Sequence, residues 1–523
     1  MQNQVYDNLY IENCRPVSGL TAAELRDIPS FAVVEGERER KLVYGGQMCN
    51  TPGKGASAVR YILPGVSAGA LGDASFCSDY KTDYCYFGGG MANAISSVEM
   101  TIALGRAGFM CSYGAGGVSE QELEEAIDKI NAALPKKNYM INFLNSNNPA
   151  REMALAKLLI RKGVPVIEAS AFIELSPALI YYKVSGLRRL ADGSVASERK
   201  IIAKLSREEV SARFMAPPSA AVVSGLLKEK LITAQQAKMA AEIPLADDIT
   251  VEADSGGHTD NRPLVALLPA IISQRDKFQQ KYKFKKRTRI GAAGGISTPE
   301  SALAAFQMGA AYVVTGSVNQ SCIEAGTSEY VKNTLAQVAM SDVVMAPCAD
   351  MFEMGAKVQV IKKGTMFPMN AQKLYDLYIK YKSIDDLKDS EIMRLEKMIF
   401  KCPVSEVWDE VVSFFEKTDK GQLTLMEKNG KVKMAMIFRW YLGKSSKWAV
   451  DGLDARKMDM QIWCGQAMGA FNTWCKGTPL EKPENRRVAD IAGLIMDGAA
   501  YLQLRNMAEA AGVEAGSMPE LTL

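Results

Sequence analysis

Short apolar runs alternate with longer amphipathic segments through the middle of the chain. Each run holds three to five residues rich in Val, Ile, Phe or Tyr, which is typical of a buried strand. Several of the segments between them repeat apolar residues with the 3.6-residue period of a helix. The predicted strands cover residues 84–87, 109–113, 139–143, 164–168, 201–205, 249–251, 289–292 and 311–315.

Eight strands alternating with helices predict a (β/α)8 TIM barrel. A doubly wound open sheet is the alternative for the same alternation. The count of eight, together with the paired glycines after the last two strands, favours the barrel, which we expect over residues 76–370. Ser119, with Glu122 three residues later, is expected to cap the second barrel helix.

The two ends of the chain differ from the barrel pattern. Residues 1–75 are charge-rich and then rich in Gly and Pro, so we expect an irregular N-terminal segment that wraps the barrel. Residues 371–523 have mostly helical patterns with abundant Trp and Met, and we expect a C-terminal helical domain there.

Two departures are expected inside the barrel. A hairpin is predicted about the turn at 191–194, with strands at 181–184 and 195–197. Residues 216–247 carry two helical patterns, the second capped at Thr233, and predict an inserted helical subdomain. An insertion of this length serves as a lid or partner surface about as often as it simply packs.

Composition narrows the class of protein. Apolar residues make up 48% and charged residues 23% of 523, which is typical of a globular protein, and the net charge of +3 gives no indication of nucleic-acid binding. The ten cysteines form no Cys-x-x-Cys pair and the chain has one histidine, so no metal site is expected. Cysteines of this kind suit the reducing cytoplasm, as small buried apolar residues. The polar N-terminus predicts that there is no signal peptide, and the lack of a long apolar stretch predicts no membrane span.

The single histidine, His258, is the candidate catalytic residue. It follows Gly256 and Gly257, just beyond the predicted strand 249–251. Glycines let backbone approach a ligand closely, and imidazole exchanges a proton near neutral pH. The alternative is a loop histidine with an ordinary structural role.

Glycine turns after the last two strands predict a phosphate site. Gly294 and Gly295 follow strand seven, and Gly316 and Ser317 follow strand eight. In (β/α)8 enzymes a phosphate commonly lies between these two loops, at a helix N-terminus. The alternative is that both are merely tight turns.

At the other predicted strand ends the residues are polar or small, and they are expected to surround an apolar centre. An amide, a lysine and carboxylates in this arrangement suit a planar heterocycle such as a flavin, with Lys204 near its N1–C2=O edge. The alternative for Lys204 is an ion pair with a neighbouring carboxylate. The residues concerned are Gly90, Met91, Ala92, Asn142, Glu168, Lys204 and Glu252.

These motifs carry a family resemblance from about residue 71 nearly to the C-terminus. Glu252-Ala-Asp-Ser-Gly-Gly-His258, Ala292-Ala-Gly-Gly-Ile296 and Thr315-Gly-Ser-Val-Asn-Gln320 resemble trans-acting enoyl reductases of polyketide and polyunsaturated fatty-acid synthases. Gly90-Met-Ala-Asn-Ala, Glu168-Ala-Ser-Ala-Phe, Ala349-Asp-Met-Phe-Glu353 and the tail segment 461–471 fit the same subfamily.

The resemblance implies FMN as prosthetic group, NADPH as reductant, and an enoyl thioester on an acyl carrier protein as substrate. Hydride would pass through the flavin to the β-carbon, while His258 polarises the thioester carbonyl or assists protonation. A homodimer is a further expectation at family level. The alternatives are a nitronate monooxygenase-like flavoprotein, in which His258 abstracts a proton, and a non-catalytic scaffold.

An acidic carrier protein would dock on a basic surface. The most basic run, residues 277–289, precedes strand seven and is expected to form a solvated face at the opposite end of the barrel. The insertion at 216–247 and the helical tail are better placed.

Overall fold

The computed structural model describes residues 6–37, 39–146 and 148–521. The first five residues, on which the prediction of no signal peptide partly rests, lie outside this range, as does one residue of the charged stretch at 35–41. Within the described part, no single helix is long and apolar enough to cross a membrane; only Glu208–Met215 and Ala220–Lys228, which meet at a bend of 52°, are long and apolar enough when taken together.

A closed parallel barrel forms the centre of the molecule. Its strands are hydrogen-bonded in the order β10-β13-β14-β16-β17-β7-β8-β9, and each overlaps its predicted run, so the prediction of a (β/α)8 barrel is confirmed. In chain order they are β7 (Tyr86–Gly88), β8 (Met110–Tyr113), β9 (Met140–Leu144), β10 (Val166–Ser170), β13 (Lys200–Leu205), β14 (Asp248–Glu252), β16 (Arg289–Ala293) and β17 (Val313–Thr315).

Seven helices follow the first seven strands in order. Ser119 caps the second of them through a capping box with Glu122, as predicted. The helices are α3 (Val98–Arg106), α4 (Glu120–Ala133), α5 (Pro149–Arg161), α6 (Pro177–Val184), α7 (Glu208–Met215), α10 (Leu264–Tyr282) and α11 (Pro299–Gln307).

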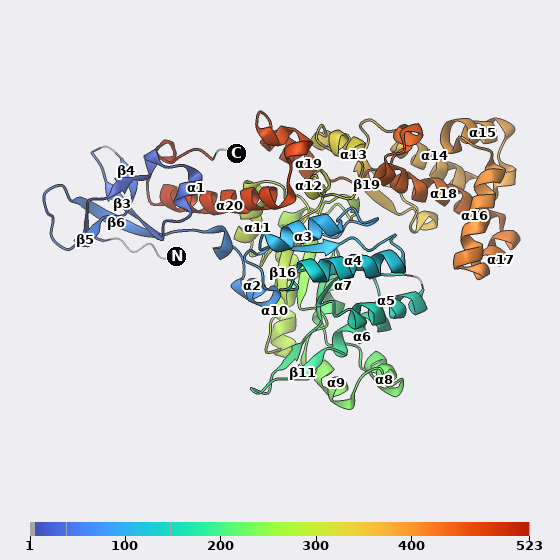
Figure 1. The fold of residues 1–523 in the computed structure, drawn as a ribbon, viewed down its shortest axis with the longest axis horizontal. Helices are drawn as coiled ribbons and strands as arrows, with labels where there is room; N and C mark the ends of the chain where they lie inside the picture. The colour runs from blue at the N-terminus through green and yellow to red at the C-terminus, as the bar shows by residue number, and fades with distance from the viewer. Residues whose placement is uncertain (1–5, 38, 147, 522–523) are drawn as a thin grey trace.

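The eighth barrel helix comes from the far end of the chain. Helix α20 (Val488–Ala510) packs against α11 and α3, the helices of strands seven and one, and so closes the helical ring (Figure 1). Everything between the short helix α12 (Ser317–Gln320) and α20 is therefore an insertion between strand eight and its helix. The boundary expected near residue 370 does not hold for α20, which belongs to the barrel.

The insertion, residues 321–487, has a small sheet and a helical lobe at one end of the molecule (Figure 1). Strands β18 (Val343–Pro347) and β19 (Lys357–Ile361) form a hairpin, and β19 also pairs with β15 (Gly257–His258) from the barrel. The lobe's longer helices are α14 (Phe367–Lys380), α16 (Val404–Thr418), α17 (Lys420–Lys428) and α18 (Gly430–Asp451), and α19 (Ala467–Trp474) follows it.

The prediction of an irregular N-terminal segment is wrong. Residues 10–64 form a six-stranded antiparallel sheet in the order β2-β4-β3-β6-β1-β5, which lies beyond the end of α20, away from the helical lobe (Figure 1). Its apolar residues Phe31, Val33 and Leu63 pack against Leu504 and Ala508 of α20. Its strands are β1 (Tyr10–Glu12), β2 (Arg15–Pro16), β3 (Ser30–Glu35), β4 (Arg40–Tyr44), β5 (Gln47–Cys49) and β6 (Ser57–Pro64).

The two departures predicted inside the barrel are present in altered form. The hairpin pairs β11 (Leu187–Arg189) with β12 (Val195–Ser197), but residues 181–184 belong to helix α6 rather than to a strand. Residues 216–247 contain α8 (Ala220–Lys228) and α9 (Ala234–Met239), and Thr233 caps α9 through Gln236.

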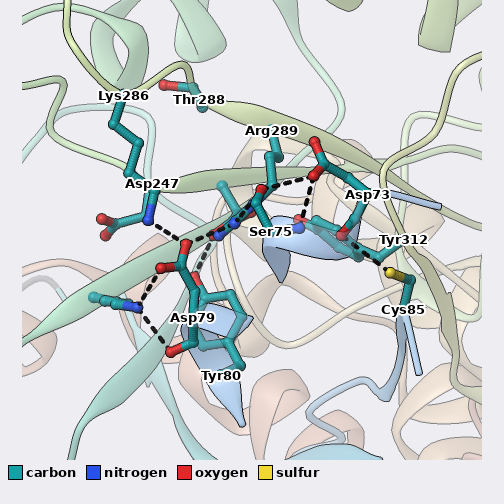
Figure 2. Close-up of polar contacts among 12 residues, drawn as sticks. Asp73, Ser75, Asp79, Tyr80, Cys85, Asp247, Lys286, Thr288, Arg289 and Tyr312 are labelled. Atoms are coloured by element: carbon teal, nitrogen blue, oxygen red, sulfur yellow. Dashed lines mark hydrogen bonds and ion pairs between the residues drawn. The ribbon is translucent and has the colours of Figure 1, made fainter. Parts of the chain in front are cut away.

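The N-terminal end of the barrel is closed by ion pairs rather than by a solvated basic face. Arg289 is 2% exposed and bonds Asp248 from Nε at 2.5 Å and Asp79 of α2 (Ala74–Tyr80) from a terminal nitrogen at 2.6 Å (Figure 2). Lys286 also pairs with Asp79. The expectation of a solvated run at 277–289 is therefore wrong at Arg289, although Lys283 and Lys285 are exposed.

Candidate functional site

A buried polar cluster lies where the first strands end. Glu168, in the middle of β10, is fully buried, and its Oε2 accepts hydrogen bonds from the Asn142 amide at 3.0 Å and the Gly90 N–H at 3.0 Å. A side chain at Gly90 would collide with Glu168 and Asn142, since a Cβ there lies 2.4 Å from Glu168 Oε2. Glycine is required at this position, and three predicted site residues meet here.

Lys204 joins this cluster to the next strand. Its Nζ lies 3.9 Å from Glu168 Oε1 and 3.6 Å from Glu252 Oε1. Burial disfavours the charged amine, but the two carboxylates outweigh it and raise the pKa of Lys204. Burial raises the pKa of Glu252, and the nearby Glu168 adds to this while Lys204 opposes it. The ion-pair alternative for Lys204 is thus present in the structure, with Lys204 held as a cation.

Two glycine turns make a cradle of backbone donors beside this cluster. Gly294 and Gly295 have φ of +84° and +78°, a left-handed conformation that glycine adopts without strain. Added Cβ atoms at Gly295 and Gly316 would meet nothing within 4 Å, so both turns border open space. Among the described residues, the Gly295 and Ile296 N–H groups donate to no protein acceptor. The cradle lies at the starts of α11 and α12, where free N–H groups favour an anion.

The insertion supplies part of this site, which the strand pattern did not predict. Gly465 donates its N–H to Ser317 Oγ at 2.9 Å, which leaves the Ser317 hydroxyl proton free to donate elsewhere. A Cβ at Gly256 would lie 2.9 Å from the Cys464 backbone, so the absence of a side chain at Gly256, two residues before His258, allows this close approach. The segment around Cys464 and Gly465 therefore bridges the His258 loop and the end of strand eight.

Gln359 of β19 stabilises the loop that carries His258. Its Nε2 donates to Asp254 Oδ1 at 2.8 Å, and Asn261 donates to the same oxygen at 2.8 Å. Sequence reasoning missed Gln359 and Gly465, because both lie in the insertion, far along the chain. The sequence did point to the segment that contains Gly465, because residues 461–471 are among the motifs of the family resemblance, but it suggested no role for that segment.

His258 lies at the edge of the cluster rather than inside it. It pairs with Val358 in the short ladder of β15 and β19, and its side chain is 48% exposed. Its Nε2 lies 3.6 Å from Asp350 Oδ2, and its charge acts on Glu252. Gly257 precedes it with φ of +81° and open space beside its α-carbon.

The loop after strand one completes this end of the barrel. Met91 donates its N–H to Ser96 Oγ at 2.8 Å, and Gly114 packs against the Met91 carbonyl. Ala92 packs beside Gly116, so Met91 and Ala92 contact the loop that follows β8. Asn93 and Ala94 on this loop have positive φ of 58° and 55°, and strained backbone of this kind often marks a functional site.

Two cavities lie outside this site. One of about 370 Å³ lies between α5, α6 and α8, and one of about 330 Å³ between α3, α4 and α18. Neither is lined by Glu168, Lys204, His258 or the glycine cradle, so neither is the candidate site.

The fold is shared with known proteins. The structure of FabK from Thermotoga maritima matches with a TM-score of 0.51 over 83% of this chain and 98% of that one, at 17% identity. The enoyl reductase domain of MlnA, from the macrolactin biosynthesis cluster of Bacillus amyloliquefaciens, matches with a TM-score of 0.81 at 39% identity, over 84% of this chain and 99% of that domain. The match to the MlnA domain defines the class of this chain as a barrel oxidoreductase of the enoyl reductase type.

Relatives found by sequence show to which family of enoyl reductases the chain belongs. Polyketide biosynthesis protein PksE of Bacillus subtilis (strain 168) is 44% identical over 85% of this chain and 58% of its own length. One of the polyunsaturated fatty acid synthase proteins of Thraustochytrium sp. is 43% identical over 90% of this chain but only 23% of its own length. This chain belongs to the family of trans-acting enoyl reductases of polyketide and polyunsaturated fatty-acid synthases.

The chain spans little more than half of PksE and about a quarter of the Thraustochytrium synthase protein. Residues 381–460, most of the helical lobe, match the family model described as acyl-carrier-protein S-malonyltransferase, inserted helical domain.

Proposed function

We propose that this chain reduces the α,β-double bond of an enoyl thioester, with FMN as prosthetic group and NADPH as reductant. The observation that carries the proposal is the placement of an anion cradle, a buried polar cluster and the only histidine at one end of a barrel from this family. The substrate would arrive on an acyl carrier protein of a synthase, as the names of the relatives imply. A homodimer and a cytoplasmic location stay predictions.

The donor set fits FMN. A phosphate dianion suits the open space at Gly295 and Gly316, where backbone N–H groups and the Ser317 hydroxyl are available. Asn142, Glu168 and Lys204 offer an amide, a carboxylate and a cation to the polar edges of an isoalloxazine ring. A bound FMN would supply the hydride carrier between nicotinamide and substrate.

The chain's own residues would supply charge and a proton. Lys204, kept cationic by Glu168 and Glu252, would offer positive charge to stabilise the negative charge that a bound flavin gains on reduction. His258 would donate a hydrogen bond or a proton to the thioester oxygen or α-carbon, at an edge of the site that solvent reaches. Gln359 and Gly465 would hold the loops that carry these groups.

The test is anaerobic. The purified protein's flavin is reduced with NADPH, a crotonyl thioester is added, and flavin absorbance is followed. We expect reoxidation without oxygen. The His258→Ala variant should take up hydride from NADPH as the parent does but be slower in the second step by about 10²–10³-fold, the usual cost of one oxyanion donor.

Two other outcomes separate the alternatives. If the flavin stays reduced with both a free thioester and a carrier-bound one, until air is admitted, the chain is a nitronate monooxygenase-like flavoprotein. If the purified protein retains no flavin and takes none up, the scaffold hypothesis replaces the enzyme.

A further inference from the structure

Two thiols lie in contact at the N-terminal end of the barrel. The Sγ atoms of Cys77, on α2, and of Cys85, directly before β7, are hydrogen-bonded at 3.6 Å. All ten cysteines of the chain lie in the described part, and this is the one pair whose sulfurs bond each other. Neither thiol takes part in the proposed reaction, which belongs to the opposite end of the barrel.

The turn after α2 brings these two cysteines together. Lys81 ends the helix at φ of +57°, and its N–H and that of Thr82 both donate to the Cys77 carbonyl. A left-handed cap of this kind turns the chain away from the helix axis, so the chain comes back past Cys77 and enters β7 at Cys85. Local backbone geometry therefore determines that the two thiols meet.

Cys85 is held in place, whereas Cys77 has room to move. Cys85 is fully buried, its thiol donates to the Asp73 carbonyl at 3.3 Å (Figure 2), and a Cβ at Gly72 would lie 2.7 Å from its own Cβ. Cys77 is half-buried, and Ser78 beside it is exposed. A disulfide needs the two sulfurs about 1.5 Å closer than they are, which rotation about the Cα–Cβ bond of Cys77 can supply.

The two thiols differ in acidity. The hydrogen bond with Cys85 is the largest influence on the pKa of Cys77 and lowers it. The Thr82 hydroxyl and the Arg289 charge lower this pKa further, while burial and the charge of Asp83 oppose them. The same hydrogen bond, followed by burial, raises the pKa of Cys85, which stays a neutral thiol. Because the thiolate is the nucleophile that reacts with oxidants, Cys77 is the attacking partner and Cys85 the resolving one.

We propose that Cys77 and Cys85 form a modification site that hydrogen peroxide converts to an intramolecular disulfide. The Cys77 thiolate attacks one peroxide oxygen, the O–O bond breaks, and a sulfenic acid forms with loss of hydroxide. The Cys85 sulfur then attacks the Cys77 sulfur, the S–O bond breaks, and the Cys85 proton leaves with that hydroxide as water. In sum, the two thiols lose two electrons and two protons, and peroxide is reduced to two waters.

The disulfide attaches α2 covalently to the start of β7. Asp79, on the same helix, already pairs with Arg289 of β16 at 2.6 Å and with Lys286. Strands β16 and β7 are separated by β17 in the barrel, so oxidation links α2 to a second strand. Thiols of a reducing compartment reverse such a bond, which makes the modification transient. The inference does not depend on the proposed enzymatic function.

Peptide mapping tests the proposal directly. Trypsin cleaves after Lys81, so Cys77 and Cys85 fall in separate peptides, 61–81 and 82–106, which only a disulfide joins. The purified full chain is treated with a few equivalents of hydrogen peroxide, free thiols are alkylated, and the digest is analysed by mass spectrometry without reductant. We expect the linked pair, about 2 Da lighter than its two peptides together, and its disappearance after treatment with dithiothreitol.

Cys402 supplies the matched control. It is half-buried like Cys77, but burial raises its pKa and its thiol donates to the Phe400 carbonyl. Peroxide should consume Cys77 at least about tenfold faster than Cys402, and Cys402→Ser should still form the link. Cys85→Ser should leave Cys77 to accumulate as sulfinic acid. The proposal is overturned if peroxide that oxidises Cys402 gives no linked peptide, or one that joins other cysteines.

Thermal unfolding tests the effect of the link on α2. The oxidised protein should melt about 1–4 °C above the reduced protein, because a disulfide restricts the unfolded chain. Dithiothreitol should remove the gain, and Cys77→Ser should show none after the same peroxide treatment. A melting temperature that does not rise as the linked peptide accumulates would contradict the covalent attachment of α2 to β7.

Discussion

The glycines at the proposed phosphate site matter because they leave the space beside their α-carbons empty. Gly316 has a negative φ of −132°, outside the left-handed region that favours glycine, and a Cβ there meets no described atom within 4 Å. The position therefore tolerates a side chain as far as folding is concerned. Only a ligand in the open space would be affected by one.

Gly316→Asp should consequently fold normally and lose its flavin. The carboxylate would put negative charge where the phosphate is proposed to bind, and we expect flavin affinity to fall at least about tenfold, or 1.4 kcal/mol. The ratio of flavin to protein absorbance after purification, followed by titration with FMN, measures it. Gly443→Asp, at an exposed glycine of α18 with equally open surroundings, is the matched control. Equal flavin content in both variants would place the phosphate elsewhere.

Site residues on the strands were predictable one by one, and those on the insertion were not. Asn142, Glu168 and Lys204 each lie on a strand recognisable in the sequence, and these parallel strands are neighbours in the barrel. Asp350, Gln359 and Gly465 reach the site only through a ladder and close packing set by the whole fold. No local pattern specifies such long-range pairing.

At the scale of elements, α20 connects the barrel to both neighbouring regions of the chain. Its buried face includes Ile491, Ile495 and Ala499, while Leu504 and Ala508 lie in the core shared with the N-terminal sheet. Gly498 lies where the helix meets α11, since a Cβ there would be 2.5 Å from Pro299 Cγ. Pro299 begins α11, directly behind the cradle, and its ring cannot move aside.

Enlarging Gly498 should therefore disturb the barrel. Gly498→Val is expected to destabilise the fold by about 1–3 kcal/mol, the usual cost of overpacking. Gly493→Ala on the same helix meets nothing within 4 Å and should instead gain about 0.5–1 kcal/mol of helix stability. Thermal unfolding followed by circular dichroism compares the two. A neutral Gly498→Val would show that α20 does not pack on α11 in solution.

The elements that sequence reasoning missed share a cause. Strands β3 and β6 of the N-terminal sheet bury Phe31 and Leu63 on one face, but a charged turn and a Gly- and Pro-rich stretch flank them. The charged and Gly- and Pro-rich flanking stretches therefore determine most of the composition of residues 1–75. The barrel strands, by contrast, are buried on both sides and appear in the sequence as continuous apolar runs. The role of α20 as the eighth barrel helix could not be predicted, because strand eight lies more than 150 residues before it in the chain.

At the scale of the molecule, the N-terminal end of the barrel is stabilised by the ion pairs that Asp79 of α2 forms with Lys286 and Arg289. Burial opposes ionisation of Asp79, but the Lys286 ammonium and the charges of Arg289 and Lys200 hold its pKa at about 2. A carboxyl with a depressed pKa stabilises the fold above its unfolded pKa near 4 and loses that contribution as pH falls towards 2. The contribution is about 2 kcal/mol at neutral pH.

Asp79→Asn should therefore unfold at lower temperature at pH 7 yet lose less stability than the parent between pH 5 and about pH 2. Melting curves across this range measure the difference. Asp27→Asn, whose parent carboxylate is 83% exposed, should follow the parent protein. Parallel acid profiles for the parent and Asp79→Asn would mean that the pair does not form.

The late position of α20 also bears on how the protein is made. A ribosome that has finished strand eight must still add residues 321–487 before the last barrel helix emerges, which takes roughly ten to thirty seconds at common elongation rates. Throughout that interval the nascent barrel has a gap in its outer ring, with apolar surface of α11 and α3 uncovered. Chaperones that bind exposed apolar surface would find their target there, and release would await the arrival of α20.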